Sequence, residues 1–190
     1  MTRDRGHRGD TGRDGGGAPR DVIAAGSTFV IERVGPADAD LLLPIYRRCE
    51  DFLALGSVSR ASLAMVEADL RYSREHGGVY GVIIAAGELI GVIDYVPAGH
   101  DGDPTRAALD LLMLAVSHRG KGVGAEVVAV VEREIARNPA VTSITSWVQV
   151  NNERAVAFWR RHGYEKVGGA KAAPDGTTVY ELRKRLPRLQ

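Results

Sequence analysis

The most restrictive feature of the chain is an apolar run that leads through a glycine-rich turn into a helical pattern. Residues 107–116, AALDLLMLAV, are apolar at nearly every position, as expected of a strand covered on both faces. Three glycines follow among basic side chains in HRGKGVG, 118–124, and residues 122–137 then carry apolar side chains on one helical stripe. The first amides of a helix lack a backbone acceptor and point outward. This order of elements predicts an anion site where the helix begins.

From Thr28 onward the apolar pattern switches between a period of two and a period of about 3.6 residues, which predicts an α/β fold with a mixed sheet and flanking helices. Pro44 implies that the first helix starts or kinks at that residue. The expected strands are 28–34, a hairpin over 78–99, 107–116, 141–150 and 177–186. The expected helices are 37–55, 61–78, 122–137 and 152–163.

The N-terminal segment 1–26 contains almost no apolar side chains and many glycines. Such a segment cannot bury enough apolar surface to offset the entropy cost of ordering it, so we expect a disordered tail followed by one domain over 27–190. The segment lacks the apolar centre of a signal peptide, and no later run reaches the roughly 20 residues of a membrane helix. The sequence therefore predicts no membrane partner.

The charges of the chain nearly balance, with 25 Lys and Arg against 24 Asp and Glu and a formal net charge of +1. No global field would attract nucleic acid, so an anion site has to be local. The only cysteine, Cys49, cannot form an internal disulfide or a zinc cluster, and its apolar neighbours favour a core position. We expect a cytoplasmic protein, monomeric or homodimeric, with no metal and no nucleic-acid partner.

Known phosphate-binding motifs can be compared with the glycine turn. A Walker A loop needs Ser or Thr after its Gly-Lys pair, but Gly120-Lys121 is followed by Gly122. The dinucleotide fingerprint G-x-G-x-x-A is satisfied by Gly120, Gly122 and Ala125. That fingerprint also needs an acidic residue at the end of the next strand, and 143–150 supplies none. A dinucleotide oxidoreductase is therefore the less favoured interpretation, and glycines without any ligand are a further alternative.

The turn Arg119–Gly124 resembles the R-x-x-G-x-G loop of the GCN5-related N-acetyltransferase (GNAT) superfamily. A second stretch resembles that family's N-x-x-A-x-x-F-Y-x-x-x-G-F segment at the same spacing, through Asn152, Ala155, Phe158, Trp159, Gly163 and Tyr164. The resemblance covers about residues 28–185. It implies a mostly antiparallel central sheet with flanking helices and a splayed pair of parallel strands at the CoA site. It also implies an acetyltransferase that moves an acetyl group from acetyl-CoA to a primary amine by direct transfer in a ternary complex.

The resemblance implies which residues bind the acetyl donor. Amides of the turn would hold the pyrophosphate of acetyl-CoA, with added charge from Arg119 and Lys121. Backbone groups of 114–116 would pair with the pantetheine amides, and the N–H of Val116 or a near neighbour would face the thioester carbonyl. Asn152 would bond the pantetheine arm. The expected cofactor-binding residues are Leu114, Ala115, Val116, Arg119, Gly120, Lys121, Gly122, Val123, Gly124, Asn152 and Trp159.

The sequence departs from the family pattern in two places. Relatives commonly have four residues between the strand's Val and the loop's Arg, whereas only Ser117 and His118 separate Val116 from Arg119, which predicts a tighter turn. Trp159 stands where the family often has a Tyr, proposed as the acid that protonates the departing thiolate. An indole N–H delivers no proton near neutral pH, so we do not carry that role over. A catalytically weak CoA-binding regulatory or interaction module is therefore the alternative to an enzyme.

Transfer to an amine also needs a base, because an ammonium group has no lone pair to attack with. Asp94 and Asp110 interrupt otherwise apolar strands, and burial would raise the pKa of such a carboxyl toward a useful value. Both are candidate catalytic residues, with strand capping or pairing to an arginine as the alternative. We expect His118 in a solvent-facing loop, and Tyr95 and Trp147 in packing roles. The acceptor is expected to be a small-molecule or peptide amine.

Overall fold

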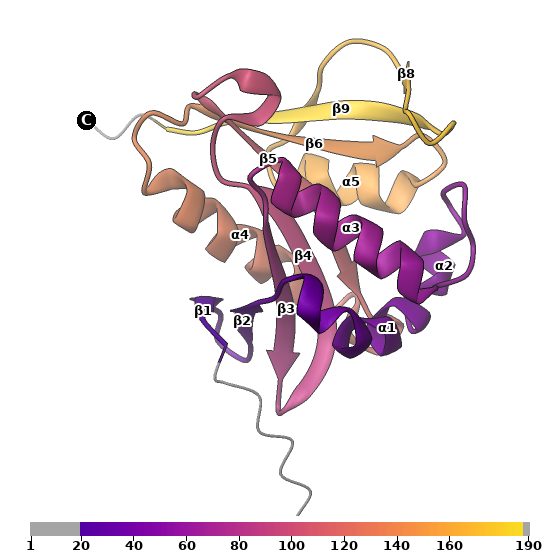
Figure 1. The fold of residues 1–190 in the computed structure, drawn as a ribbon. Coiled ribbons are helices and arrows are strands. Elements are labelled where there is room, and N and C mark those ends of the chain that lie inside the picture. The colour runs from indigo at the N-terminus through magenta and orange to yellow at the C-terminus, as the bar shows by residue number, and fades with distance from the viewer. Residues whose placement is uncertain (1–19, 188–190) are drawn as a thin grey trace, which may run out of the picture.

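One sheet organises the fold in the computed structural model, which describes residues 20–187 (Figure 1). Its strands are β1 (Val22–Ala25), β2 (Val30–Arg33), β3 (Val79–Ala85), β4 (Glu88–Val96), β5 (Arg106–Leu114), β6 (Ser143–Gln149), β7 (Glu165–Lys166), β8 (Lys171–Ala172) and β9 (Thr178–Arg185). The helices are α1 (Ala39–Arg47), α2 (Glu50–Leu53), α3 (Leu63–Glu75), α4 (Val123–Ala136) and α5 (Glu153–Arg161). Short 3₁₀ turns lie at Pro36–Asp38, His100–Gly102 and Val116–His118.

The strands lie in the order β1-β2-β3-β4-β5-β6-β9-β7, and β8 also pairs with β9. Every pair is antiparallel except β5–β6, which is parallel because α4 forms the crossover between them. This arrangement confirms the predicted mixed, mostly antiparallel sheet.

The parallel pair is joined over only part of its length. Its register runs from Arg106 opposite Ser143 to Leu109 opposite Ser146, although β5 continues to Leu114. The carboxyl-terminal half of β5 therefore has backbone groups on its β6 side that no strand satisfies. The predicted splay of the two strands is present, and a space between them follows from it.

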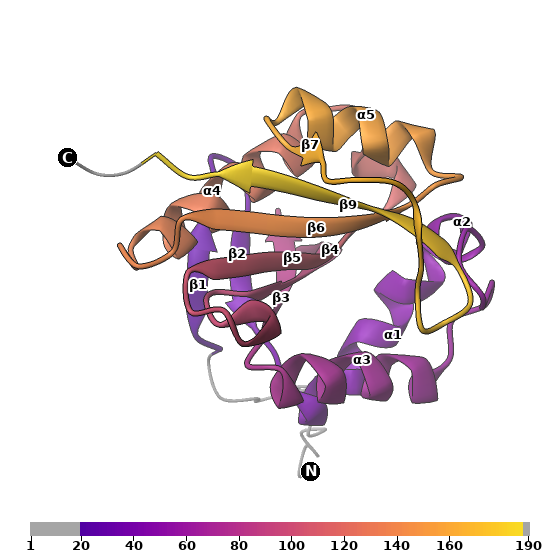
Figure 2. The ribbon, with the colours of Figure 1, turned by 90° about the horizontal axis from the view of Figure 1, so that it is seen from above.

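Helices cover both faces of the sheet, with α1 and α3 on one side and α4 and α5 on the other (Figure 2). Two hydrophobic clusters fill these layers. Val127, Val131 and Trp159 belong to the cluster under α4 and α5, while Leu42 and Leu70 belong to the cluster under α1 and α3. The apolar stripe predicted for 122–137 is the buried face of α4, which fixes the start of that helix beside the end of β5.

The helix predicted over 37–55 is broken into two. Pro44 lies inside α1, which ends at Arg47, and the separate helix α2 begins at Glu50. Cys49 lies at the break with no exposed surface, which confirms its core position. The break lets α2 turn toward the carboxyl-terminal end of β5 rather than continue along the α1 axis.

Strand β1 lies within the segment 1–26 that we expected to be an unstructured tail. Residues 1–19 of that segment lie outside the described part of the chain, but Val22–Ala25 pair antiparallel with β2. Ile23 and Ala24 pack against the core. The four-residue run VIAA therefore forms a strand, although it lies at the edge of a polar, glycine-rich stretch. A composition average over 26 residues masked this local apolar run.

Candidate functional site

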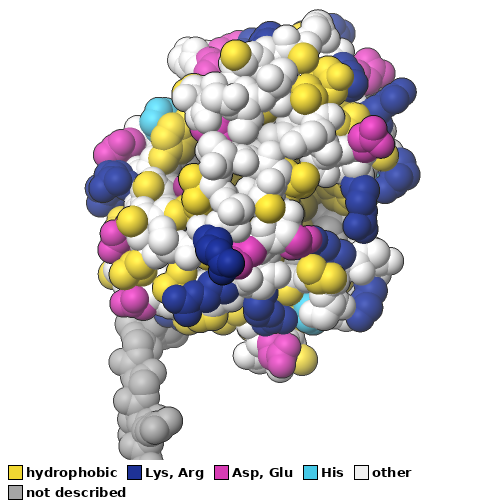
Figure 3. Space-filling view, turned by 90° about the vertical axis from the view of Figure 1, so that its right-hand side faces the viewer, with side chains coloured by type: hydrophobic (Ala, Val, Ile, Leu, Met, Phe, Trp, Pro, Cys, Tyr) yellow, Lys and Arg dark blue, Asp and Glu magenta, His cyan; other side chains and the backbone are white. Residues whose placement is uncertain are grey.

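A cleft of about 930 Å³ opens where β5 and β6 diverge. Its walls are the end of β5, the glycine turn, the first turn of α4, one face of α5, and α2. A volume of this size is typical of sites for small molecules and cofactors. Figure 3 shows the side of the molecule that carries α2, where Lys and Arg side chains border a hollow with hydrophobic side chains at its floor.

The glycine turn positions the start of α4 at this cleft. Gly120 and Gly122 have φ of +73° and +84°, a backbone region that side chains other than glycine rarely adopt. Gly122 is the N-cap of α4, and the first helical hydrogen bond runs from Glu126 N–H to the Gly122 carbonyl. The amides of the first turn, including that of Gly124, precede this bond and have no helical acceptor. The geometry is that of an anion site at a helix start.

Gly124 leaves open the space that a ligand would need. A Cβ atom built on Gly124 would lie 3.5 Å from the Leu114 side chain and 3.6 Å from that of Phe158, which is ordinary contact distance. A methyl group therefore fits, while a longer side chain would project between Leu114 and Phe158, both of which line the cleft.

Arg119 lines the cleft, but other groups of the protein already hold its guanidinium. Its Nε donates to the Leu114 carbonyl at 2.6 Å, and its two terminal nitrogens donate to the carboxylate of Asp51 on α2. The hydrogen bond from Arg119 lowers the pKa of Asp51. This pair joins α2 to the end of β5, so Arg119 holds the wall of the cleft in place in addition to supplying charge.

Helix α5 provides the opposite wall. Asn152 is its N-cap, and the side-chain oxygen accepts a hydrogen bond from Ala155 N–H at 3.0 Å, which leaves the amide NH₂ group of Asn152 facing the cleft. Arg154 and Arg161 also line the cleft, and neither forms an ion pair with any residue in the range 20–187. Sequence analysis missed these two arginines, although their spacing of seven residues places them on the same face of a helix.

The backbone of β5 alternates between its two neighbours. Ala115 N–H donates to the Ile90 carbonyl, just past the end of β4, so Ala115 is directed toward β4. The N–H and C=O groups of Leu114 and Leu112 point the other way, because direction alternates along a strand. Both leucines line the cleft. They direct backbone groups into the space between the splayed strands, where the Leu114 carbonyl already accepts the hydrogen bond from Arg119.

The strand predicted over 107–116 is two residues too long. β5 ends at Leu114, and Val116 belongs to a 3₁₀ turn, is 60% exposed and lines neither cavity. The predicted tightening of the turn was counted from Val116 to Arg119, and it stays a prediction. Four residues, 115–118, separate the strand end at Leu114 from Arg119. The apolar character of Ala115 and Val116 extended the apparent strand in the sequence.

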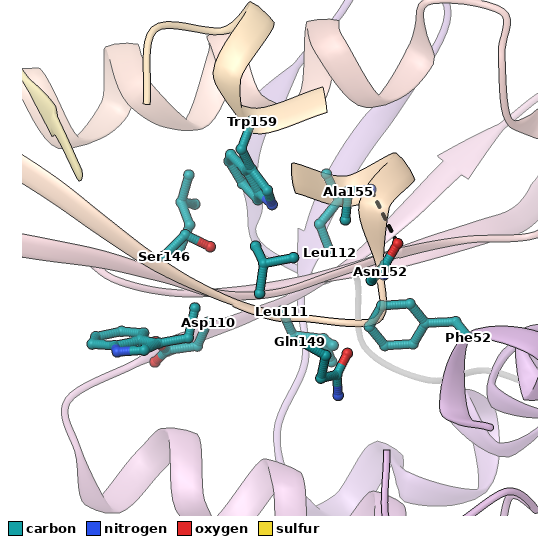
Figure 4. A pocket seen from close by; sticks show the side chains of 12 residues that line it. Phe52, Asp110, Leu111, Leu112, Ser146, Gln149, Asn152, Ala155 and Trp159 are labelled. Atoms are coloured by element: carbon teal, nitrogen blue, oxygen red, sulfur yellow. Dashed lines mark hydrogen bonds between the residues drawn. The ribbon is translucent and has the colours of Figure 1, made fainter. Parts of the chain in front are cut away.

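A second, smaller cavity of about 50 Å³ lies deeper between β5 and β6. It shares Phe52, Leu112, Asn152 and Ala155 with the large cleft, so the two spaces adjoin. Figure 4 shows Trp159 entering from α5 on one side of the two strands, and Asp110 and Gln149 on the other side. The small cavity is therefore a passage through the sheet from the α5 side toward the α3 side.

Asp110 is brought to this passage by an irregularity in the sheet. Asp94 on β4 pairs with Leu111 and Tyr95 pairs with Leu109, so Asp110 has no partner on β4. It also follows Leu109, the last residue of β5 in register with β6. Such a bulge aims a side chain out of the regular pleat. The carboxyl group of Asp110 consequently lines the cavity at the point where the parallel pairing ends.

The surroundings of Asp110 on the α3 side are aromatic and acidic. Burial raises the pKa of Asp110, while the nearby His100 and His76 lower it and Asp101 raises it further. The His76 ring stacks on Tyr72 with 4.0 Å between centroids. The pKa of Tyr72 is raised by burial and then by the negative charges of Asp110, Asp101 and Asp94. Asp94, Asp101, His76 and His100 therefore lie near enough to Asp110 or Tyr72 to influence their pKa, and Asp101 itself pairs with His100 and Arg106.

Asp94 occupies a different position from Asp110. It is 4% exposed on β4 and accepts a hydrogen bond of 2.6 Å from Ser73 Oγ on α3. Burial raises the pKa of Asp94 to about 7, against the hydrogen bond from Ser73, which lowers it. Asp94 lines neither cavity. The two candidate catalytic carboxyls are therefore separated by the sheet geometry, and only Asp110 reaches the passage.

The raised pKa of Asp94 predicts a pH-dependent stability. The unfolded carboxyl ionises near 3.9 and the folded one near 7, so its contribution to stability is full below about pH 4 and is lost as pH rises through 7. Asp94→Asn keeps an oxygen for Ser73 and removes this titration. We expect the variant to gain unfolding free energy relative to wild type between pH 4 and pH 8, by up to about 4 kcal/mol. Urea titrations of both proteins across that range would measure the difference, and a constant difference would contradict the assignment.

The remaining predicted residues are spread around the site. Lys121 is exposed and, like Val123, does not line the cleft, whereas Gly120, Gly122, Gly124 and Asn152 do. Trp159 lines only the small cavity. Trp147 also lines the small cavity and packs against His100 with 4.8 Å between ring centroids. Tyr95 is a buried core residue, as expected.

The splayed strands, the glycine turn at α4 and the facing helix α5 define an acyl-CoA-type transferase site on this fold. The chain belongs to the Acetyltransferase (GNAT) family, whose pattern it matches over residues 42–164. It is similar to the aminoglycoside N(6')-acetyltransferase type 1 of Klebsiella pneumoniae, with 33% identity over 83 residues. That match covers 44% of this chain and 41% of the relative, less than half of its length.

Two solved structures share the fold. AAC(6')-Ib in complex with ribostamycin and coenzyme A has a TM-score of 0.68 at 21% identity, covering 84% of this chain and 94% of that one. An acetyl transferase from Salmonella typhimurium that modifies the N-terminal serine of ribosomal protein L7/L12 has a TM-score of 0.72 at 15% identity, covering 88% and 100%. Within residues 20–187 no helix is both long and apolar enough to cross a membrane, and no group of three acidic, His or Cys side chains could hold a metal ion.

Proposed function

We propose that the protein is an acetyl-CoA-dependent N-acetyltransferase that acetylates a cationic primary amine by direct transfer in a ternary complex. The observation that carries this proposal is that the cleft at the start of α4 adjoins a small cavity between the splayed strands, which Asp110 lines from the other face of the sheet. A donor can enter from one side and an acceptor from the other. Both substrates can then meet without a covalent enzyme intermediate.

The cleft offers matching groups for each part of acetyl-CoA. The free amides at the start of α4 suit the pyrophosphate, and the unpaired guanidinium groups of Arg154 and Arg161 suit the remaining negative charge. The N–H and C=O groups of Leu112 and the N–H of Leu114, which face away from β4, can pair with the pantetheine amides as an added strand would, while the Leu114 carbonyl is held by Arg119. The NH₂ group of Asn152 can bond the same arm. Lys121 supplies charge near the mouth.

Asp110 is placed to act as the base, directly or through a water molecule. It takes a proton from the ammonium group of the acceptor, and the freed nitrogen lone pair attacks the thioester carbonyl carbon. The carbonyl oxygen becomes an oxyanion that the N–H of Leu112 can stabilise, in place of the N–H of Val116 that the sequence indicated. The C–S bond then breaks, the CoA thiolate leaves, and the second nitrogen proton is released as the amide forms.

Trp159 faces the position that the thiolate sulfur would take. Its indole N–H has no hydrogen-bond partner among residues 20–187, so it is available to donate to the sulfur. A thiol with a pKa of about 8.5 is already a fair leaving group without a general acid. A donated hydrogen bond is therefore sufficient for departure.

The α3 side of the passage suits a positively charged acceptor. The negative charges of Asp94, Asp101 and Asp110 all raise the pKa of Tyr72, although Asp101 is also paired with Arg106. Exposed aromatic surface from Tyr72 offers additional attraction for an ammonium group. The named relatives act on aminoglycosides or on the N-terminal serine of a protein, and both are amines of this kind. An aminoglycoside or another polycationic small amine fits the acidic surroundings better than a neutral peptide terminus does.

The decisive experiment is a thiol-release assay with acetyl-CoA and a panel of an aminoglycoside, a polyamine and a peptide with a free N-terminal serine. We expect release with at least one polycationic amine. Calorimetry with acetyl-CoA alone provides the control for donor binding. Tight binding of acetyl-CoA with no release across the panel would favour a CoA-binding regulatory module, while binding of NAD instead would favour an oxidoreductase.

Substitutions at Trp159 test the proposed departure of the thiolate. Because the leaving group needs no proton from this residue, Trp159→Phe is expected to retain most of the turnover, and Trp159→Tyr to raise it no more than a few-fold. Steady-state kinetics with the best amine of the panel would measure both. An inert wild type combined with a hundredfold gain in Trp159→Tyr would overturn the enzyme assignment.

A further inference from the structure

We propose that Trp159 and Phe52 form the walls that limit the transferred acyl group to two carbons, so that the protein selects acetyl-CoA over longer acyl-CoA thioesters. The inference rests on the proposed function and adds donor selectivity to it. It starts from the small cavity between β5 and β6, where the thioester end of a donor lying along the cleft would arrive.

The size of the small cavity sets the first limit. It measures about 50 Å³. An apolar cavity of about 150 Å³ holds benzene, which has six carbon atoms, so the available space corresponds to about two or three heavy atoms. A two-carbon acyl group fills it. Each additional methylene has to displace a wall or point out of the passage.

The Trp159 wall is held rigidly from behind. The indole is 6% exposed and contacts the rings of Phe158 and Tyr164 at centroid distances of 5.3 and 4.8 Å. Tyr164 is itself fixed by a hydrogen bond of 2.9 Å to Glu132 on α4. The indole cannot swing away without disturbing the packing between α4 and α5. This wall therefore does not yield to a longer acyl chain.

The Phe52 wall stands on α2, on the other side of the passage in Figure 4. Two polar contacts hold this short helix. Asp51 pairs with Arg119 at the end of β5, and the Leu55 carbonyl accepts a hydrogen bond of 3.2 Å from Asn151 at the start of α5. Phe52 lies between these contacts and lines both the cleft and the small cavity. The ring is thus held across the gap between the splayed strands.

The far end of the cavity is polar. Asp110 and Gln149 line it on the side of the strands away from Trp159 (Figure 4). An alkyl chain that extended past two carbons would cover the Asp110 carboxyl and separate it from the acceptor amine and from water. Longer donors are therefore disfavoured for two reasons: the rigid walls leave no room for them, and their alkyl chains would block access to the Asp110 carboxyl.

The expected selectivity is measured with acetyl-, propionyl- and butyryl-CoA at a fixed concentration of the best amine. One methylene in a close-fitting apolar pocket changes specificity by roughly tenfold to two-hundredfold. We expect the wild-type kcat/KM to fall at least tenfold from acetyl to propionyl and further to butyryl. Trp159→Leu and Phe52→Leu, which remove ring atoms from either wall, should each reduce the acetyl-to-butyryl ratio at least tenfold. Phe52 is only half-buried, so its variant tests the inference even if Trp159→Leu does not fold.

Arg161→Gln is the matched control, because Arg161 lines the cleft but not the small cavity and would contact the CoA part that all three donors share. It should change kcat/KM for all three donors by the same factor. Equal wild-type kcat/KM for the three donors, or ratios that neither wall variant changes, would overturn the inference. Calorimetry separates this from failure of the proposed function: no binding of acetyl-CoA overturns both, whereas binding and turnover of all three donors at equal rates overturns selectivity alone.

Discussion

Replacing Asp110 with asparagine is expected to lower kcat by about a hundredfold to ten-thousandfold, the range usual for loss of a general base. The reason is that Asp110 is the carboxyl that lines the passage at the end of the parallel pairing. Asparagine has the same shape and cannot accept the proton. The affinity for acetyl-CoA, measured by calorimetry, should change less than about twofold, because the donor enters from the opposite face of the sheet.

Asp94→Asn is the matched control for this prediction. It makes the same chemical change on the neighbouring strand, at a carboxyl that lines neither cavity. Its kcat should stay within about tenfold of wild type, since a positioned base contributes more than that. If Asp94→Asn lost as much activity as Asp110→Asn, or if Asp110→Asn kept it, the assignment of the base to Asp110 would have to be abandoned.

The pH profile gives an independent measure of the same base. Burial raises the pKa of Asp110, and a base acts only when it is deprotonated. Activity is therefore lost as pH falls through this raised pKa, and the acid limb of kcat/KM should have its midpoint above the ordinary aspartate value of about 3.9. The acceptor amine also has to lose a proton before it attacks, so its own pKa gives a second midpoint at higher pH in the kcat/KM profile. A profile measured with an amine of known pKa separates the two.

Gly124→Leu is expected to weaken acetyl-CoA binding about a hundredfold or more. The leucine side chain would project between Leu114 and Phe158, into the space beside the free amides of α4. Loss of two charge-assisted hydrogen bonds at about 1.5 kcal/mol each corresponds to such a change in affinity. Calorimetric titration with acetyl-CoA would measure it, with the melting temperature as a check on folding.

Gly124→Ala is the control for the steric argument. Its methyl group fits at ordinary contact distance from both neighbours, so the affinity should fall only a few-fold. The backbone at Gly124 does not have positive φ, unlike Gly120 and Gly122, so neither substitution strains the turn. Equal affinities for the leucine variant and wild type would show that the donor does not bind at the start of α4.

The donor side of the site could be largely predicted from the sequence, because it is made of local features. A glycine turn and a helix start generate free amides by local geometry alone, and the N-cap Asn152 acts within one turn of helix. The same reasoning could have found the two arginines of α5 that line the cleft, since Arg154 and Arg161 are seven residues apart on one helix. The pairing of Arg119 with Asp51 could not be predicted in this way, because the two residues are 68 positions apart in the chain.

The amino-acid sequence by itself determined the order of the main strands and helices, the membership of the family and the position of the glycine turn at the start of α4, since periodicity and turn residues act over short distances. Tertiary structure alone decided which of the two candidate carboxyls lines the small cavity. Asp94 and Asp110 look alike in the sequence, each a single carboxyl in an apolar strand. A bulge between β4 and β5 directs Asp110 into the passage and leaves Asp94 buried against Ser73. The difference between the two carboxyls depends on the register of β4 with β5 and on the point where β6 diverges from β5, and a local sequence pattern predicts neither.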